Sequence, residues 1–272
     1  MKIASITIAR NEEKYLPSTI NSLCSQTLPL DLIIVVNDGS TDNTGKIARQ
    51  LGCIVIDLPF HEKSYTGTPE LAKIINVGLD HIKKTKVPFD FVLIVGADHA
   101  LPENYLKEIT QRMISNPKLV VASGRIKGEP YRETSPRGSG RVVQIEFWKK
   151  VNDLRYPVEW GWESWLSFKA MQMGYETRCF RDVLSRVQRP TGLGKTGMWG
   201  KGMWALGYDW KYVLGRCFLT FFKSPKAGLS MFWGWARHEN AKHLDVADWV
   251  NQMQKKRFWE SGWQIIKRGG RR

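Results

Sequence analysis

The sequence predicts an α/β fold in which a mostly parallel sheet is flanked by helices. Apolar, β-branched runs alternate with amphipathic segments through the first half of the chain, as in repeated strand–helix–strand units. The run that begins at Phe89 is apolar almost throughout and leads to a single carboxylate, Asp98. A strand buried on both faces has this composition, and ligands of open α/β sheets bind beyond the carboxyl ends of such strands. Asp98 is therefore a candidate ligand-binding residue, although an Asp after a strand is also a common helix cap.

The expected elements follow one another without an internal repeat. Strands are expected at residues 3–8, 32–36, 53–58, 89–96 and 119–121, and helices at residues 12–26, 46–51, 71–79 and 163–173. The first helix carries Leu16, Ile20 and Leu23 at the spacing of one apolar face. Because right-handed crossovers keep successive strands parallel, their carboxyl ends are expected to meet at one edge of the sheet.

The chain is strongly basic, with 41 Lys and Arg residues against 26 Asp and Glu residues and a formal net charge of +15. Such a charge predicts an anionic partner, which can be a nucleotide, a nucleic acid or a membrane surface. The four cysteines are far apart and form no C-x-x-C pair, which argues against a zinc site and a disulfide framework. We expect no signal peptide and no bilayer-spanning segment, and a cytoplasmic location.

Three short motifs occur in a fixed order near the expected strand ends. They are Ala-Arg-Asn-Glu-Glu at 9–13, Val-Val-Asn-Asp-Gly-Ser-Thr-Asp-Asn-Thr at 35–44 and Gly-Ala-Asp at 96–98. With this spacing, residues 3–190 resemble the N-terminal half of a family 2 glycosyltransferase with the Rossmann-like GT-A fold. The resemblance implies transfer of a sugar from a nucleotide diphosphate donor with inversion at the anomeric carbon. The open alternative for 37–44 is a capped turn without a ligand.

The resemblance also implies a donor-binding set at the strand ends: Ala9, Asn11, Glu12, Asp38, Gly96, Ala97 and Asp98. Asn11 and Glu12 would lie near the nucleotide, and Asp38 would accept a hydrogen bond from the base. Asp98 matches the last Asp of the family's DxD motif, which holds Mn²⁺ or Mg²⁺ on the diphosphate, and a hard cation suits carboxylate and phosphate oxygens. Gly96 replaces the first acid of that motif, so Asp98 is the single strong metal ligand. His99 is either an added nitrogen ligand or a surface loop histidine.

The acceptor side is expected at the start of the helix that ends near Gly174. By resemblance, Glu163 matches the second acid of the motif that supplies the catalytic base, and Trp162 replaces the first acid. Direct displacement at a sugar needs a carboxylate to take the acceptor's proton, and nearby tryptophans would desolvate Glu163 and stack on sugar faces. Glu163 can instead be favoured only by the helix dipole, with Glu159 as the base. The expected acceptor or phosphate region contains Glu159, Trp160, Trp162 and Arg189.

The C-terminal part, residues 191–272, is expected to form a basic, Trp-rich helical region beside a catalytic domain of residues 1–190. Apolar stretches at 212–222 and 227–236 are too short to span a bilayer. The last helix, expected at 246–267, has the basic, Trp-rich amphipathic character of a membrane-surface anchor. These helices can also cover the catalytic domain or a second subunit.

We therefore expect an inverting glycosyltransferase that is peripheral on the inner face of the cell membrane and acts on a lipid or glycan acceptor. One alternative is a nucleotidyltransferase of related fold, but residues 9–13 lack the Gly-rich basic loop that this chemistry usually shows. The other is a basic nucleic-acid-binding protein, which would interleave aromatic and basic residues on a strand face or groove. The Trp-rich basic segments look helical, so we expect membrane contact and no nucleic acid.

Overall fold

The computed structural model describes residues 1–189, 196–238 and 241–269, with side chains up to residue 256. The chain folds into two compact units. The first unit consists of Met1–Thr66, Glu70–Pro157 and Lys169–Pro190. The second unit consists of Gly67–Pro69, Val158–Phe168 and Thr191–Arg272. The segment that carries Glu163 thus groups with the C-terminal residues.

The first unit is built on an eight-stranded sheet with the order β3-β2-β1-β4-β7-β6-β8-β5. Its strands are β1 (Ile3–Ala9), β2 (Leu32–Asp38), β3 (Ile54–Leu58), β4 (Phe91–Gly96), β5 (His99–Ala100), β6 (Leu119–Ile126), β7 (Arg141–Gln144) and β8 (Glu176–Val187). Strands β3, β2, β1 and β4 are parallel to one another, β7 is antiparallel to both β4 and β6, and β8 is parallel to β6. The predicted α/β fold with a mostly parallel sheet is confirmed.

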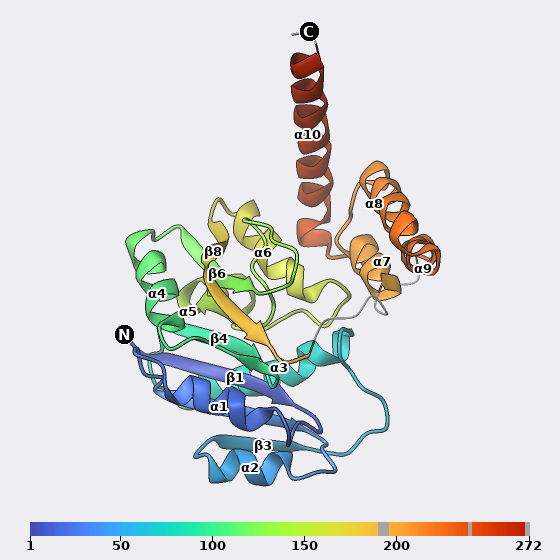
Figure 1. Cartoon of the computed structure of the whole chain (residues 1–272). Helices are drawn as coiled ribbons and strands as arrows, with labels where there is room; N and C mark the ends of the chain where they lie inside the picture. Colours follow the sequence, from blue (N-terminus) through green and yellow to red (C-terminus); the bar gives the residue numbers. More distant parts are fainter. Residues whose placement is uncertain (190–195, 239–240, 270–272) are drawn as a thin grey trace. The chain divides into compact units, whose positions relative to one another are not determined.

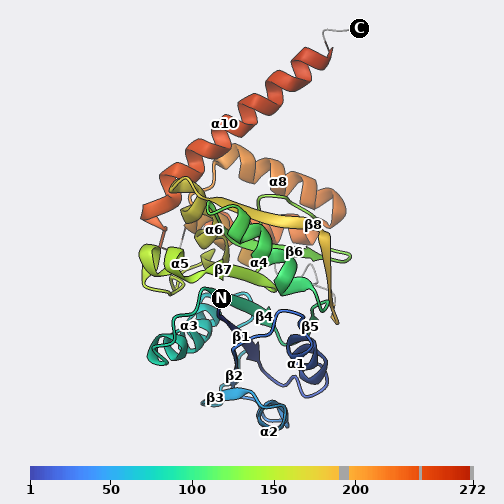
Figure 2. The ribbon, with the colours of Figure 1, turned by 90° about the vertical axis from the view of Figure 1, so that its left-hand side faces the viewer.

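Helices cover both faces of this sheet. They are α1 (Leu16–Cys24), α2 (Thr44–Gln50), α3 (Pro69–Lys84), α4 (Tyr105–Ser115) and α5 (Ile145–Asn152). Helix α6 (Trp162–Gln172) begins in the second unit. Figure 2 shows α1 and α3 on opposite sides of β1 and β4. Helix α3 can approach β1 closely because Gly78 has no side chain. A Cβ atom at this position would lie only 2.8 Å from Cγ2 of Ile6. Both faces of β1 and β4 are therefore buried, as the apolar composition of these strands predicted.

Some element boundaries differ from those predicted. Helix α1 begins at Leu16, because Asn11 adopts a positive φ of 53° and residues 12–15 form turns. Strands β7 and β8 have no long apolar run, and the sequence did not predict them. β7 inserts between β4 and β6, so the fifth predicted strand is separated from the fourth in the sheet.

The described part of the second unit contains four further helices: α7 (Thr196–Ala205), α8 (Trp210–Lys223), α9 (Pro225–Ala236) and α10 (Leu244–Gly269). Helices α8 and α9 are joined at Ser224, which ends α8 and whose hydroxyl caps α9 by accepting a hydrogen bond from the N–H of Ala227. Within 1–189, 196–238 and 241–269, none of the helices is both long enough and apolar enough to cross a bilayer. Figure 1 shows the course of these helices along the chain.

Candidate active site

The turns that follow β1 and β2 are joined to each other by hydrogen bonds. The N–H of Asn11 donates to the hydroxyl of Ser40 at 3.0 Å, and its Oδ1 accepts from the N–H of Thr41 at 2.8 Å. The N–H of Glu12 donates to Oγ1 of Thr44 at 2.7 Å. The left-handed backbone of Asn11 is thus held in place by the second turn, and Asn is among the residues that tolerate it best. Asn11 and residues 40–44 therefore form one hydrogen-bonded segment at the carboxyl ends of β1 and β2.

Asp38 lies buried at the end of β2 and meets a histidine that the sequence analysis missed. Oδ1 of Asp38 is 2.9 Å from Nε2 of His61, and the His61 ring stacks on Tyr65 with the centroids 4.1 Å apart. Arg10 contacts the His61 ring and donates to the carbonyl of Lys63 at 2.7 Å. The loop after β3 therefore reaches the carboxyl ends of β1 and β2. None of the sequence motifs described above lies in this loop, so no sequence signal indicated the contact between His61 and Asp38.

Arg189 joins two of the predicted donor-site carboxylates. Its Nε donates to Oδ2 of Asp98 at 3.0 Å, and its Nη2 forms an ion pair with Oε1 of Glu12. From the sequence, Arg189 was expected in the acceptor or phosphate region, without a link to either acid. Burial raises the pKa of Glu12 above its ordinary value, and the Asp98 charge adds to this, while the bond from Arg189 opposes it.

Pairing between β5 and β8 explains how residues so distant in sequence come together. His99 pairs with Val187 in an antiparallel ladder, and the N–H of Gln188 donates to the carbonyl of Asp98 at 2.8 Å. Figure 2 shows β5 beside the end of β8. Arg189 is the next residue after Gln188, so the pairing of β5 with β8 places its guanidinium beside Asp98, just after the end of β4.

The remaining strand-end residues have structural contacts. Ala9 is buried at the end of β1, and the carbonyl of Ala97 accepts a hydrogen bond from Oγ1 of Thr19 at 2.7 Å. The N–H of Gly96 donates to Oγ of Ser139 at 2.8 Å. The structure thus collects all seven residues of the predicted donor-binding set in the first unit, at or just after the ends of β1, β2 and β4.

His99 is neither a surface histidine nor free to bind a metal, so both expectations for it are wrong. The side chain is fully buried, and its Nδ1 and Nε2 lie 2.6 and 2.8 Å from the hydroxyls of Ser139 and Ser185. Burial lowers the pKa of His99 to about 4, so the ring is neutral at physiological pH. Both ring nitrogens serve to hold the loop after β4.

Of the residues predicted for the acceptor or phosphate region, Glu159, Trp160 and Trp162 lie in the second unit, as Glu163 does, whereas Arg189 lies in the first unit. The indole N–H of Trp162 donates to the carbonyl of Thr68 at 3.1 Å, and that of Trp165 contacts the Asp245 carboxylate at 3.2 Å. Trp160 lies under Nζ of Lys201, 4.8 Å from the ring centroid. The tryptophans at 162 and 165 are buried, whereas Glu163 in the first turn of α6 is exposed. The expectation that tryptophans bury Glu163 is therefore wrong.

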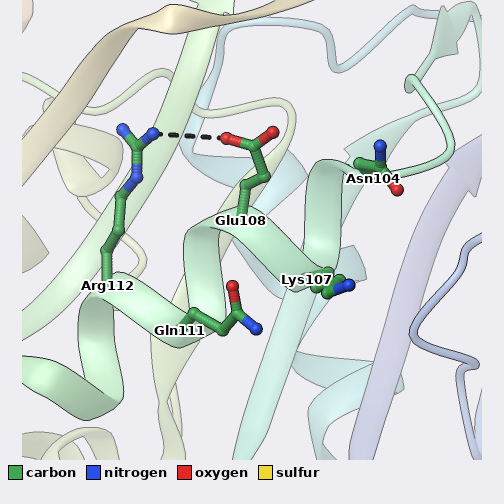
Figure 3. A pocket seen from close by; sticks show the side chains of 5 residues that line it. All are labelled: Asn104, Lys107, Glu108, Gln111 and Arg112. Carbon is green, nitrogen blue, oxygen red and sulfur yellow. Dashed lines mark hydrogen bonds and ion pairs between the residues drawn. The ribbon is translucent and has the colours of Figure 1, made fainter.

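A surface hollow lies along α4 in the first unit (Figure 3). Its lining consists of Asn104, Lys107, Glu108, Gln111 and Arg112. Arg112 and Glu108 form an ion pair of 3.2 Å, and no residue from the ends of β1, β2 or β4 contributes to the lining. Because these groups are polar and bound to one another on a single helix, we do not assign the active site to this hollow.

Comparisons with known proteins agree with the family resemblance noted in the sequence. A family model described as glycosyl transferase family 2 matches residues 5–174. The 4,4'-diaponeurosporenoate glycosyltransferase of Staphylococcus aureus (strain bovine RF122 / ET3-1) is 47% identical over 57 residues, which are 20% of this chain and 15% of that protein.

Solved structures resemble the chain over about three quarters of its length. S. aureus TarS 1-349 has a TM-score of 0.55 at 20% identity, covering 75% of this chain and 63% of that one. The mannosyltransferase PcManGT from Pyrobaculum calidifontis, solved with GDP-Man and Mn²⁺, has a TM-score of 0.61 at 16% identity, covering 74% of this chain and 61% of that one. Glucosyl-3-phosphoglycerate synthase from Mycobacterium tuberculosis has a TM-score of 0.55 at 16% identity, covering 74% of this chain and 77% of that one. The chain spans less than two thirds of the length of TarS 1-349 and of PcManGT. The likeness to these structures confirms the predicted GT-A fold.

We expect the free energy of unfolding to fall as the pH decreases from about 6.5 to about 4, because buried His99 stays neutral while the unfolded chain binds a proton. One such proton contributes at most about 1.4 kcal/mol per pH unit. His99→Gln removes this titrating group. The free energy of unfolding of the variant, measured with denaturant, should therefore depend less steeply on pH between about pH 6.5 and about pH 5. Equal slopes for the two proteins would contradict the neutral, buried assignment of His99.

Proposed function

Because the chain belongs to glycosyl transferase family 2, we propose that it transfers a sugar from a nucleoside diphosphate donor to an acceptor with inversion at the anomeric carbon. The observation that carries this proposal is the gathering of Glu12, Asp38 and Asp98 at the carboxyl ends of parallel strands. Ligands of open α/β sheets bind at this edge. The chain belongs to a family of glycosyltransferases, and its transfer activity, donor, acceptor and residue roles are what we propose.

The proposed donor site uses the two polar clusters of the first unit. Asp38 accepts a hydrogen bond from the nucleobase, next to His61 and Tyr65, whose stacked rings offer an aromatic surface for the base. Asp98 and Arg189 lie on the diphosphate side. Oε2 of Glu12 is buried without a hydrogen-bond partner among the described residues, which supports a ligand here because buried acceptors are normally bonded.

The residues at Asp98 do not complete a divalent-metal site. Gly96 has no side chain, both ring nitrogens of His99 are bonded to serines, and Asp98 is paired with Arg189. No three His, Cys, Asp or Glu side chains of the described residues form a group that could hold a metal ion. PcManGT was solved with Mn²⁺, but no step of the reaction proposed for this chain is assigned to a metal.

We assign the catalytic base to Glu163, with Glu159 as the alternative. The hydrogen bonds from Trp162 to Thr68 and from Trp165 to Asp245 fix the first turn of α6, and Glu163 stands exposed between these two anchored residues. In an inverting displacement the acceptor's oxygen bonds to the anomeric carbon while a carboxylate takes its proton. An exposed carboxylate on a fixed helical turn suits this role.

Glu163→Gln should retain donor binding and lower sugar transfer by about 10²- to 10⁴-fold, because the amide keeps the size of the side chain but cannot accept the proton. Binding is measured by calorimetry and transfer by product formation. Glu146→Gln is the matched control, since Glu146 is also an exposed acid in the first turn of a helix and should leave transfer unchanged. Unimpaired transfer by Glu163→Gln would refute the assignment, and loss in Glu159→Gln would move it to Glu159.

We further propose that α8 and α9 bind a membrane surface. Eight large apolar side chains on these helices are exposed: Trp210, Leu214, Phe218, Leu219, Phe221, Phe222, Leu229 and Trp233. The opposite side of the same helices packs through Val213, Cys217 and Met231 in the core of the second unit. We call these eight exposed side chains the α8–α9 apolar face. A helix pair with one buried and one exposed apolar side is suited to lie in the membrane interface.

Charge supports an anionic bilayer as the partner of the α8–α9 apolar face. Residues 210–238 contain no Asp or Glu, and their basic residues are Lys211, Arg216, Lys223, Lys226 and Arg237. Basic residues near an anionic surface each contribute about 1 kcal/mol of attraction. A lipid or lipid-linked glycan is accordingly the proposed acceptor, at the inner face of the cell membrane.

The first half of α10 contributes less to this surface than predicted. Val246 and Val250 are fully buried, and Trp249 lies 6.4 Å from the ring of Phe168. This part of the helix therefore packs within the second unit. The remaining aromatic positions predicted to face a membrane, Trp259 and Trp263, lie outside the described side chains.

The double variant Phe218→Ser and Phe222→Ser should weaken binding to vesicles with anionic lipid by about tenfold or more, because two of the most exposed apolar side chains lose their burial in the interface. Vesicle flotation at constant salt measures this. Ile114→Ser, at an exposed position of α4 in the first unit, is the control and should float as the wild type does. Equal flotation of all three proteins would contradict the α8–α9 assignment.

A further inference from the structure

A guanidinium occupies the position at which the family resemblance implied a metal ion. Nε of Arg189 is 3.0 Å from Oδ2 of Asp98, and Nη2 binds Oε1 of Glu12. Asp98 is the one acid left of the expected metal-binding motif, because Gly96 provides no ligand. Arg189 therefore already neutralises the carboxylate that a divalent cation would need.

Contacts along the chain fix Arg189 at this place. Its guanidinium carbon lies 5.0 Å from the ring centroid of Tyr15, within cation–π distance. The preceding residue, Gln188, is tied to the carbonyl of Asp98 through its N–H and to the carbonyl of Tyr15 through its side-chain amide at 3.3 Å. A group held from several sides needs little reorganisation when charge develops beside it.

The guanidinium keeps hydrogen-bonding capacity for a ligand. Two of its nitrogens bind the carboxylates, whereas Nη1 has no hydrogen bond within the described residues. The side chain is 47% exposed, while Glu12 and Asp98 are 11% and 23% exposed. An arginine with this arrangement can bind phosphate oxygens while the two acids hold its orientation.

We propose that Arg189, and not a divalent metal ion, is the cation that binds the donor's diphosphate. This inference rests on the proposed donor site. When the bond between the anomeric carbon and the diphosphate oxygen breaks, its electron pair stays on that oxygen and Arg189 donates hydrogen bonds to the diphosphate. The acceptor's oxygen forms the new bond to carbon, and its proton passes to the general base. The guanidinium thus stabilises charge that grows on the leaving group.

The test is the binding of nucleoside diphosphates to the full chain, measured by calorimetry with a panel that includes UDP and GDP. Wild-type affinity in EDTA should equal that in Mn²⁺ within about twofold. Arg189→Ala should bind about tenfold or more weakly in EDTA, because a charge-assisted hydrogen bond is lost. Mn²⁺ should restore the affinity of this variant, since Glu12 and Asp98 are then two unpaired carboxylates.

Two further variants separate charge, geometry and folding. Arg189→Lys should recover only part of the affinity in EDTA, because an ammonium cannot contact both acids and a phosphate as the planar guanidinium does. Arg181→Gln is the matched control on the same strand, exposed and outside the site, and should bind as the wild type does.

Each outcome has one meaning. Wild-type binding that falls about tenfold or more in EDTA would overturn the inference and assign the cation role to a metal. Arg189→Ala binding that equals the wild type in EDTA would also overturn it, because Arg189 would then contribute nothing to diphosphate binding. Wild-type binding of no diphosphate in either buffer would instead overturn the proposed donor site on which the inference rests. Circular dichroism melting of each variant confirms that weak binding does not reflect unfolding.

Discussion

The ion pairs of Arg189 with Glu12 and Asp98 are the interaction on which the candidate site depends. The two acids follow β1 and β4, which are neighbours in the sheet, so parallel strand pairing alone brings two carboxylates to one edge. Two partly buried carboxylates close together disfavour ionisation unless a cation lies between them. The short β5–β8 ladder supplies that cation from a point more than 90 residues beyond Asp98 in the chain. The same strand pairing that completes this edge of the sheet therefore also places the cation of the candidate site.

The sequence predicted the parallel half of the sheet because each of its central strands is buried on both faces. β4 is a continuous apolar run and β1 is mostly apolar, and polar residues follow the end of each strand. β7 and β8 could not be found in this way. β8 is half exposed and carries charged residues such as Arg178 and Asp182, so its strand conformation depends on pairing with β6 rather than on its own composition.

The same distinction holds within the site. Asp38 and Asp98 were predicted because each follows a strand with an obvious apolar pattern. His61 was missed because its contact with Asp38 depends on the course of a polar loop, which no local periodicity reports. His99 was misjudged because burial of a histidine depends on the serines that receive it, Ser139 and Ser185, which lie about 40 and 86 residues away. Arg189 was predicted in the acceptor or phosphate region, but its contacts with Glu12 and Asp98 depend on the pairing of β5 with β8, which the sequence did not predict.

In the second unit, sequence patterns predicted the helices better than their burial. The two apolar stretches became α8 and α9, yet which side is covered follows from packing against Met203 and Met231, which the sequence did not indicate. Trp162 and Trp165 were expected to surround a catalytic acid and instead anchor α6 through their indole N–H groups. Large aromatic residues near a candidate acid therefore indicate burial of the helix as readily as contact with a sugar.

The most direct test of the account is the release of nucleoside diphosphate from a panel of UDP-, GDP- and dTDP-sugars by the wild type and by Asp38→Asn. The account predicts slow release from one class of donor by the wild type, and a release from that donor that is weaker by about tenfold or more in Asp38→Asn, because Asp38 is the proposed contact to the base. Release that is equal in the two proteins, or indifferent to the base, would contradict a donor site at the ends of β1, β2 and β4.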